Sequence, residues 1–167
     1  QEENINTCVS SIRKLQEKGW DITELHIENG LSKVVENTGI LGRWQIIHQK
    51  PLTICDTAHN EDGIKNVLAQ IQETPHEQLH IVLGTVNDKN IEKILALLPK
   101  NAIYYFCEAN IPRALPKEVL AKLAEQQNLK GKTYANVADA LGTAKSLSNS
   151  SDLIFIGGST FVVAEVL

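Results

Sequence analysis

Residues 52–64 read LTICDTAHNEDGI, and within them an apolar run changes abruptly to polar and ionisable residues. The apolar run at 52–55 predicts a buried strand, and an amphipathic helix is expected from residue 61. Between the two come Asp56, His59 and Asn60. In an open α/β sheet, ligands bind where the carboxyl end of a strand meets the amino end of the next helix. The cluster is therefore a candidate site, although an Asp or Asn before a helix can also act only as a cap.

The rest of the chain alternates strand-like and helix-like segments. Strands are predicted at 44–48, 52–55, 79–84, 102–107 and 153–157, with a short extended piece near 133–135. Helices are predicted at 61–73, 89–98, 116–127, 136–148 and from 159. This alternation predicts an α/β fold with a mostly parallel sheet. Before it, residues 4–18 and a weaker segment at 22–37, interrupted by Gly30, predict a helical appendage.

Composition narrows the class of protein. Of 167 residues, 43% are apolar and 22% are charged, with a net charge of −4. The negative charge argues against a nucleic-acid partner. The sequence has no apolar run near the ~20 residues that span a bilayer, so we expect no membrane partner and a cytoplasmic location. The three cysteines form no C-x-x-C pair, and Cys55 and Cys107 lie in strand-like runs that favour buried, inert thiols.

The chain contains no Met and begins with Gln. A translation product needs an initiator residue. We therefore expect this sequence to be a piece of a longer protein, so that any site shared with another domain is only half visible.

Three other clusters follow predicted strands. Gly84 is followed by Asn87, Asp88 and Lys89, which can form a turn and a helix cap. A loop with two prolines holds Arg113, which could contact an anion. The last cluster is Gly157-Gly158-Ser159-Thr160, where a hydroxyl and free helix N–H groups could hold a carboxylate or phosphate. The sequence has neither a G-x-x-x-x-G-K-[ST] loop nor a G-x-G-x-x-G motif.

Taken in chain order, these clusters match the motif pattern of one known family. The residues that carry the resemblance are Gly42-Arg43-Trp44-Gln45, Asp56-Thr57-Ala58-His59-Asn60, Gly84 with Asn87-Asp88-Lys89, Arg113-Ala114-Leu115 and Gly158-Ser159. The pattern is similar to the carboxy-terminal domain of folylpolyglutamate synthase and bifunctional dihydrofolate synthase, in the Mur ligase superfamily. The family usually has Gly where this chain has Thr57, and Pro where it has Glu61.

The resemblance implies a Rossmann-like sheet with one antiparallel strand. It assigns residues 38–167 to a Mur ligase C-terminal-type α/β domain, and residues 1–37 to the helical tail of a preceding ATP-binding domain plus a connector. The implied activity is ATP-dependent addition of L-glutamate to a folate or pteroate carboxylate through an acyl phosphate. The Walker loop and most Mg²⁺ ligands would lie in the preceding domain, so this fragment alone should be inactive.

Individual roles also follow from the resemblance. Arg43 would contact ATP phosphates, Asp56 would accept a hydrogen bond from the ribose, and Asn60 would assist in cofactor binding. His59 would act at the reaction centre or on the incoming glutamate. Gly158 and Ser159 would hold a glutamate carboxylate. No role is assigned to Lys89 or Arg113.

Two alternatives stay open. One is a muramyl-peptide ligase, which has a similar D-x-x-H motif. The other is a non-catalytic nucleotide-binding or interaction domain. The sequence does not distinguish dihydrofolate synthase from folylpolyglutamate synthase, and it does not give the oligomeric state.

Overall fold

The computed structural model describes residues 2–87 and 91–167, so the predicted position of Lys89 lies outside the described residues. The chain divides into two compact units, Gln1–Leu41 and Gly42–Leu167. No helix in the described part of the chain is both long and apolar enough to cross a membrane.

The first unit is helical. It contains α1 (Glu2–Glu17), α2 (Glu24–Ser32) and α3 (Val34–Thr38). The predicted interruption at Gly30 is wrong, because Gly30 lies inside α2 and the break falls at Lys33. One exposed glycine costs a helix only about 1 kcal/mol relative to Ala, which a capped helix tolerates. Thr23 caps α2, since its side chain accepts a hydrogen bond from the His26 N–H.

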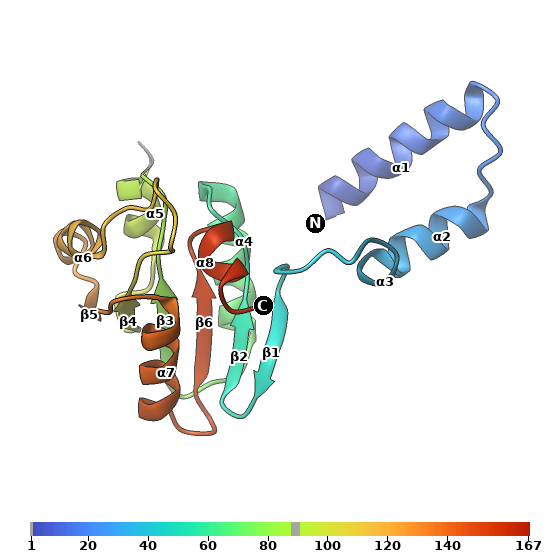
Figure 1. Ribbon diagram of the computed structural model, residues 1–167. Helices are drawn as coiled ribbons and strands as arrows, with labels where there is room; N and C mark the ends of the chain where they lie inside the picture. The colour runs from blue at the N-terminus through green and yellow to red at the C-terminus, as the bar shows by residue number, and fades with distance from the viewer. Residues whose placement is uncertain (1, 88–90) are drawn as a thin grey trace. The chain divides into compact units, whose positions relative to one another are not determined.

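The second unit is built on a six-stranded sheet of order β1-β2-β6-β3-β4-β5 (Figure 1). The strands are β1 (Gln45–Gln49), β2 (Leu52–Cys55), β3 (Leu79–Leu83), β4 (Ile103–Phe106), β5 (Lys130–Thr133) and β6 (Leu153–Gly157). The β1–β2 pair is antiparallel and every other pair is parallel. The predicted fold class, a mostly parallel sheet with one antiparallel strand, is confirmed.

Helices cover both faces of this sheet. They are α4 (Glu61–Glu73), α5 (Ile91–Leu97), α6 (Lys117–Gln126), α7 (Val137–Leu147) and α8 (Thr160–Ala164). Helices α4, α5 and α6 pack in one apolar cluster, and α7 and α8 pack in the other. The central strands β3 and β6 are buried along their whole length, as expected of parallel strands covered on both faces.

The outer strand β5 differs from the prediction. An extended piece was expected near 133–135, whereas the strand is Lys130–Thr133 and all four residues are exposed. Its sequence, KGKT, has no apolar alternation to mark it. Gly131 fits here because a Cβ at this position would lie 2.3 Å from the carbonyl oxygen of Tyr104 on β4.

Candidate active site

The sheet brings the predicted motifs to one edge. The parallel strands β2, β3, β4 and β6 all end there, and the antiparallel β1 starts there, because Gln45 pairs with Cys55. The residues before β1 and after β2 therefore meet. Because β1 is antiparallel to β2, Arg43 lies at the same edge of the sheet as the other candidate residues.

The two strongest sequence motifs form one structural unit. The carboxylate of Asp56 accepts a hydrogen bond from the Trp44 N–H at 2.7 Å through Oδ2, and from the Ala58 N–H at 2.8 Å through Oδ1. The Thr57 N–H donates to the Gly42 carbonyl at 2.9 Å. Asp56 is only 7% exposed. It thus ties the turn before β1 to the loop after β2.

The turn at residues 42–44 is unusual in its backbone. Gly42 has φ of +72° and Trp44 has φ of +45°. A Cβ at Gly42 would lie 2.8 Å from Cγ2 of Thr57 and 2.9 Å from Cγ1 of Val163, so no larger residue fits. Thr57 therefore packs against Gly42 rather than standing free beside Asp56.

Arg43 projects from this turn and is exposed. An arginine that precedes a strand can serve merely as a structural salt bridge. No ion pair or hydrogen bond holds the Arg43 side chain among the described residues. Its guanidinium donors are available to a ligand.

A pocket of about 280 Å³ lies at the same edge, and we call it the carboxyl-edge pocket. Its lining includes His59, Arg113 and Ser159, which come from three separate loops. A parallel sheet predicts that Asp56, His59, Lys89, Arg113 and Ser159 all project from this edge and line a shared face. His59, Arg113 and Ser159 do line one pocket, whereas Lys89 lies outside the described residues. Asp56 and Arg43 are not among the lining residues.

Backbone pairing places Arg113 in the pocket. Val86 and Ala114 form an isolated antiparallel bridge. The Asn87 N–H donates to the Arg113 carbonyl at 3.1 Å, and the Leu115 N–H donates to the Thr85 carbonyl at 2.9 Å. The loop after β4 is thereby fastened to the loop after β3.

The guanidinium of Arg113 lies over an aromatic ring. Its central carbon is 4.8 Å from the ring centroid of Phe161, within the range of a cation–π interaction. Among the described residues it has no carboxylate partner. A permanently charged, planar donor is thus held in place with its hydrogen-bonding groups available to an anion.

His59 is oriented by its own loop. Its Nδ1 lies 3.0 Å from the carbonyl oxygen of Thr57, and a carbonyl can only accept, so Nδ1 carries the proton. The neutral ring then leaves Nε2 as an acceptor for a ligand.

Ser159 and Asn60 both cap helices. Ser159 is 3% exposed, and its Oγ accepts from the Phe161 N–H at 3.2 Å, which leaves its O–H able to donate. Gly158 joins this residue to β6 and is buried. Asn60 is exposed, and its side chain accepts from the Gly63 N–H at 2.8 Å, which supports the capping alternative for this residue.

Cys55 and Cys107 are buried, as predicted. Burial raises the pKa of Cys55 to about 11 and that of Cys107 to about 12. Both therefore stay protonated and unreactive at neutral pH. In the described ranges, no group of three His, Cys, Asp or Glu side chains could hold a metal ion.

Residues 42–160 match the family described as Mur ligase, glutamate ligase domain. The chain belongs to this family. The matched range begins at Gly42, the first residue of the second structural unit. It contains both the turn at residues 42–44 and the loop that begins at Asp56.

Two comparisons show that this Mur ligase domain is similar to parts of folate enzymes. It is 31% identical to the Haloferax volcanii protein named "Probable bifunctional folylpolyglutamate synthase/dihydropteroate synthase", over 99% of this chain and 19% of that protein. It also matches the structure of E. coli FolC in complex with ADP, without folate substrate, with 27% identity and a TM-score of 0.82. That match covers 99% of this chain and 38% of FolC. The chain thus spans well under half of each of these proteins.

The Mur ligase domain also resembles a peptidoglycan enzyme. It is 27% identical to the UDP-N-acetylmuramoyl-L-alanyl-D-glutamate–2,6-diaminopimelate ligase of Listeria monocytogenes, over 80% of this chain and 29% of that protein. The chain is therefore similar both to folate enzymes and to a muramyl-peptide ligase.

Sequence reasoning missed the aromatic contributor to the pocket. Phe161 lies against Arg113 and lines the pocket, yet it was predicted only as part of the last helix. The available signal was an aromatic residue two positions after the capping Ser159, in a helix whose other residues are Thr, Val and Ala.

Proposed function

We propose that this Mur ligase domain is part of an ATP-dependent folylpolyglutamate synthase or dihydrofolate synthase. The reaction joins the α-amine of L-glutamate to a folate or pteroate carboxylate that ATP has activated as an acyl phosphate. The observation that carries the proposal is the carboxyl-edge pocket, where Arg113, His59 and Ser159 converge. The names of the Haloferax and E. coli relatives support the folate branch.

The pocket suits an amino-acid carboxylate. Arg113 supplies a fixed positive charge on the ring of Phe161, and the Ser159 hydroxyl supplies a donor in the same pocket. Hydrogen bonds between an ionised carboxylate and a guanidinium are among the stronger polar contacts in proteins. We assign the glutamate carboxylate to Arg113, Ser159 and the adjoining backbone of Gly158.

His59 is assigned to the reacting end of glutamate. With its proton on Nδ1, the imidazole presents Nε2 as an acceptor, which suits removal of a proton from the attacking ammonium group. Its position in the same pocket as Arg113 allows the amino acid to be held at one end and deprotonated at the other.

The nucleotide is assigned to the turn at residues 42–44 and the adjoining Asp56. Arg43, exposed and without an intramolecular partner in the described part of the chain, would contact the phosphates. Each oxygen of Asp56 already accepts one backbone hydrogen bond, and a carboxylate can accept about four, so a ribose hydroxyl can still be accommodated. Asn60 is placed at the margin of this site, since its side chain is already used as a cap.

The remaining parts of the reaction are assigned outside these residues. The phosphate loop and Mg²⁺ would belong to a preceding ATPase domain of the same protein, with residues 1–37 as its helical tail and connector. Chemistry would then require closure of the two domains over the substrates. Mg²⁺ would neutralise charge on the transferred phosphate. The chain described here should therefore bind substrates without turning them over.

The experiment is an assay of the full-length protein with ATP and two amine donors. L-Glutamate with a folate or pteroate acceptor should support release of ADP. Diaminopimelate with a UDP-muramyl dipeptide should not. Turnover of the muramyl substrate alone would replace the folate proposal by the peptidoglycan one, and turnover of neither would leave a non-catalytic role.

A further inference from the structure

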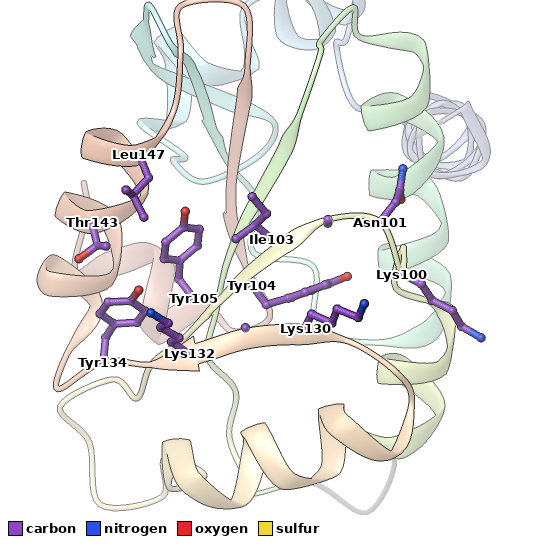
Figure 2. A pocket seen from close by; sticks show the side chains of 12 residues that line it. Lys100, Asn101, Ile103, Tyr104, Tyr105, Lys130, Lys132, Tyr134, Thr143 and Leu147 are labelled. Atoms are coloured by element: carbon purple, nitrogen blue, oxygen red, sulfur yellow. The ribbon is translucent and has the colours of Figure 1, made fainter.

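A second hollow lies along the outer strands β4 and β5. It measures about 560 Å³ and shares no lining residue with the carboxyl-edge pocket (Figure 2). We call it the β5 groove. Its size falls in the range of sites for small organic ligands.

The groove exists because one face of β5 is left uncovered. Helix α6 packs against β5 on one face of the sheet. On the other face α7 packs against β3, β4 and β6 through its own small, buried residues Ala140 and Ala144. Ile103 on β4 is 41% exposed and Leu147 at the end of α7 is 65% exposed, so apolar surface borders the gap.

The charge of the groove is one-sided. Lys100, Lys130 and Lys132 line it, and no Asp or Glu belongs to its described lining. None of these three lysines forms an ion pair within the described ranges, whereas Lys14, Lys65 and Lys117 all do. In a chain with a net charge of −4, three unpaired lysines around one hollow make a local positive site.

The strand register sets the direction of two lysines. Lys130 pairs with Ile103 and Lys132 pairs with Tyr105, so all four side chains belong to the same face of the sheet. Figure 2 shows Lys132 beside Tyr134, across from Thr143 of α7. Cations and aromatic rings are thus presented together.

The aromatic part of the groove is rigid. The rings of Tyr105 and Tyr134 lie with centroids 5.6 Å apart, and the Tyr105 hydroxyl is hydrogen-bonded to Nδ1 of buried His80 at 2.8 Å. Tyr134 is half-buried and its N–H donates to the Phe106 carbonyl at 2.8 Å. A ligand ring placed here would meet a surface that needs no rearrangement.

We propose that the β5 groove binds a small organic polyanion that carries a flat ring. The ring would lie against Tyr134 and the neighbouring apolar side chains, and the negative groups would lie beside Lys130 and Lys132. Nucleoside polyphosphates and aromatic polycarboxylates share this chemistry. The proposal does not depend on the carboxyl-edge pocket, because the two sites have no residue in common.

The test is a titration of the isotopically labelled chain, monitored by the backbone amide resonances. The probes are ATP, p-aminobenzoyl-triglutamate and inorganic tripolyphosphate, which has the charge without a ring. At least one ring-bearing probe should cause saturable shifts at Lys130, Lys132, Tyr134 and Thr143, more tightly than tripolyphosphate. The tighter of the two ring-bearing probes identifies the source.

Variants make the result specific. Lys130→Gln with Lys132→Gln should weaken the groove shifts at least about tenfold, because two hydrogen bonds to a charged ligand are lost. The matched control is Lys122→Gln with Lys145→Gln, which removes the same charge from two exposed lysines outside the groove. Tyr134→Leu should weaken the ring-bearing probe and leave tripolyphosphate unchanged.

Three results would overturn the proposal. They are the absence of saturable groove shifts with either ring-bearing probe, equal weakening by the control pair, and tripolyphosphate binding as tightly as both ring-bearing probes. If the lysines serve only to keep the open edge of β5 from pairing with other chains, the double variant will self-associate and no probe will shift the groove.

Discussion

The Asp56 carboxylate accepts a hydrogen bond from the backbone N–H of Trp44 at 2.7 Å, and this contact joins the turn before β1 to the loop after β2. Trp44 has φ of +45°, so the bond holds a conformation that the backbone does not prefer. Arg43, immediately before Trp44, is presented to solvent by the same turn. Asp56 thus supports the arginine that we assign to the nucleotide.

Asp56→Ala should lower both the stability of the chain and the affinity of the full-length protein for ATP. Two backbone N–H groups lose a charged acceptor, at about 1.5–3 kcal/mol for each hydrogen bond. The KM for ATP should rise more than the KM for glutamate, because a contact between Asp56 and the ribose contributes mostly uniform binding of the nucleotide. A double-mutant cycle with Arg43→Ala provides the control. If Asp56 acts through Arg43, the two effects on ATP will be strongly non-additive. Purely additive effects would remove the link between the two residues.

His59→Ala and Asn60→Ala should separate catalysis from capping. His59 is exposed, so its loss should leave the melting temperature unchanged while lowering kcat or raising the KM for glutamate about tenfold or more. Asn60→Ala removes a helix cap and should cost about 1 kcal/mol of stability. Thermal unfolding and steady-state kinetics on both variants check this. The opposite pattern, with His59→Ala affecting only stability, would move this residue out of the active site.

The buried pair of His80 and Asp152 should make stability fall on the acid side of neutrality. Nε2 of His80 lies 3.5 Å from Oδ2 of Asp152, and burial lowers the pKa of His80. Below about pH 6.5, the unfolded chain takes up a proton that folded His80 does not, so the free energy of unfolding decreases as the pH falls. The N–H of Asn149 lowers the pKa of Asp152, whose stabilising contribution is lost separately, as the pH falls below its ordinary value of 3.8.

Urea unfolding between pH 8 and pH 5 measures the His80 effect. His80→Gln should flatten the dependence on pH in this window, even if its stability at pH 8 is lower. The surface variant His48→Gln is the control and should keep the wild-type slope, since His48 is exposed. An unchanged slope in His80→Gln would show that another group is responsible.

Residues 1–167 alone should show no glutamate-dependent ATP turnover. The sequence has no phosphate-binding Walker loop, and no metal-binding group occurs within the described ranges. The measurement is ADP release with a folate and L-glutamate, compared with the full-length protein under the same conditions. Turnover by this chain alone would contradict the division of labour proposed above.

The sequence predicted the elements whose pattern is strong. The strand at 52–55 and the helix at 61–73 match the structure because each combines an apolar period with a clear boundary, and Asn60 caps the helix. The strand β5 was misplaced because an exposed edge strand needs no apolar residues. Gly131 there reflects close contact with Tyr104, which only the folded chain reveals.

Parallel topology predicted which candidate residues lie together, but it did not predict their individual contacts. Strand order explains why His59 and Ser159 meet, and parallel topology was enough to anticipate it. The contacts of Trp44 with Asp56 and of Arg113 with Phe161 were not predicted, because each pair joins segments that are distant in sequence. Local patterns contain no information on such contacts.

The central claim is that the carboxyl-edge pocket holds the carboxylate of glutamate, and the glutamate dependence of Arg113→Ala in the full-length protein tests it most directly. The KM for glutamate should rise about tenfold or more, because a charge-assisted hydrogen bond is lost, while the KM for ATP should stay within about twofold of the wild-type value. Phe161→Leu should have a smaller effect in the same direction. An unchanged KM for glutamate in a folded Arg113→Ala enzyme would contradict the claim.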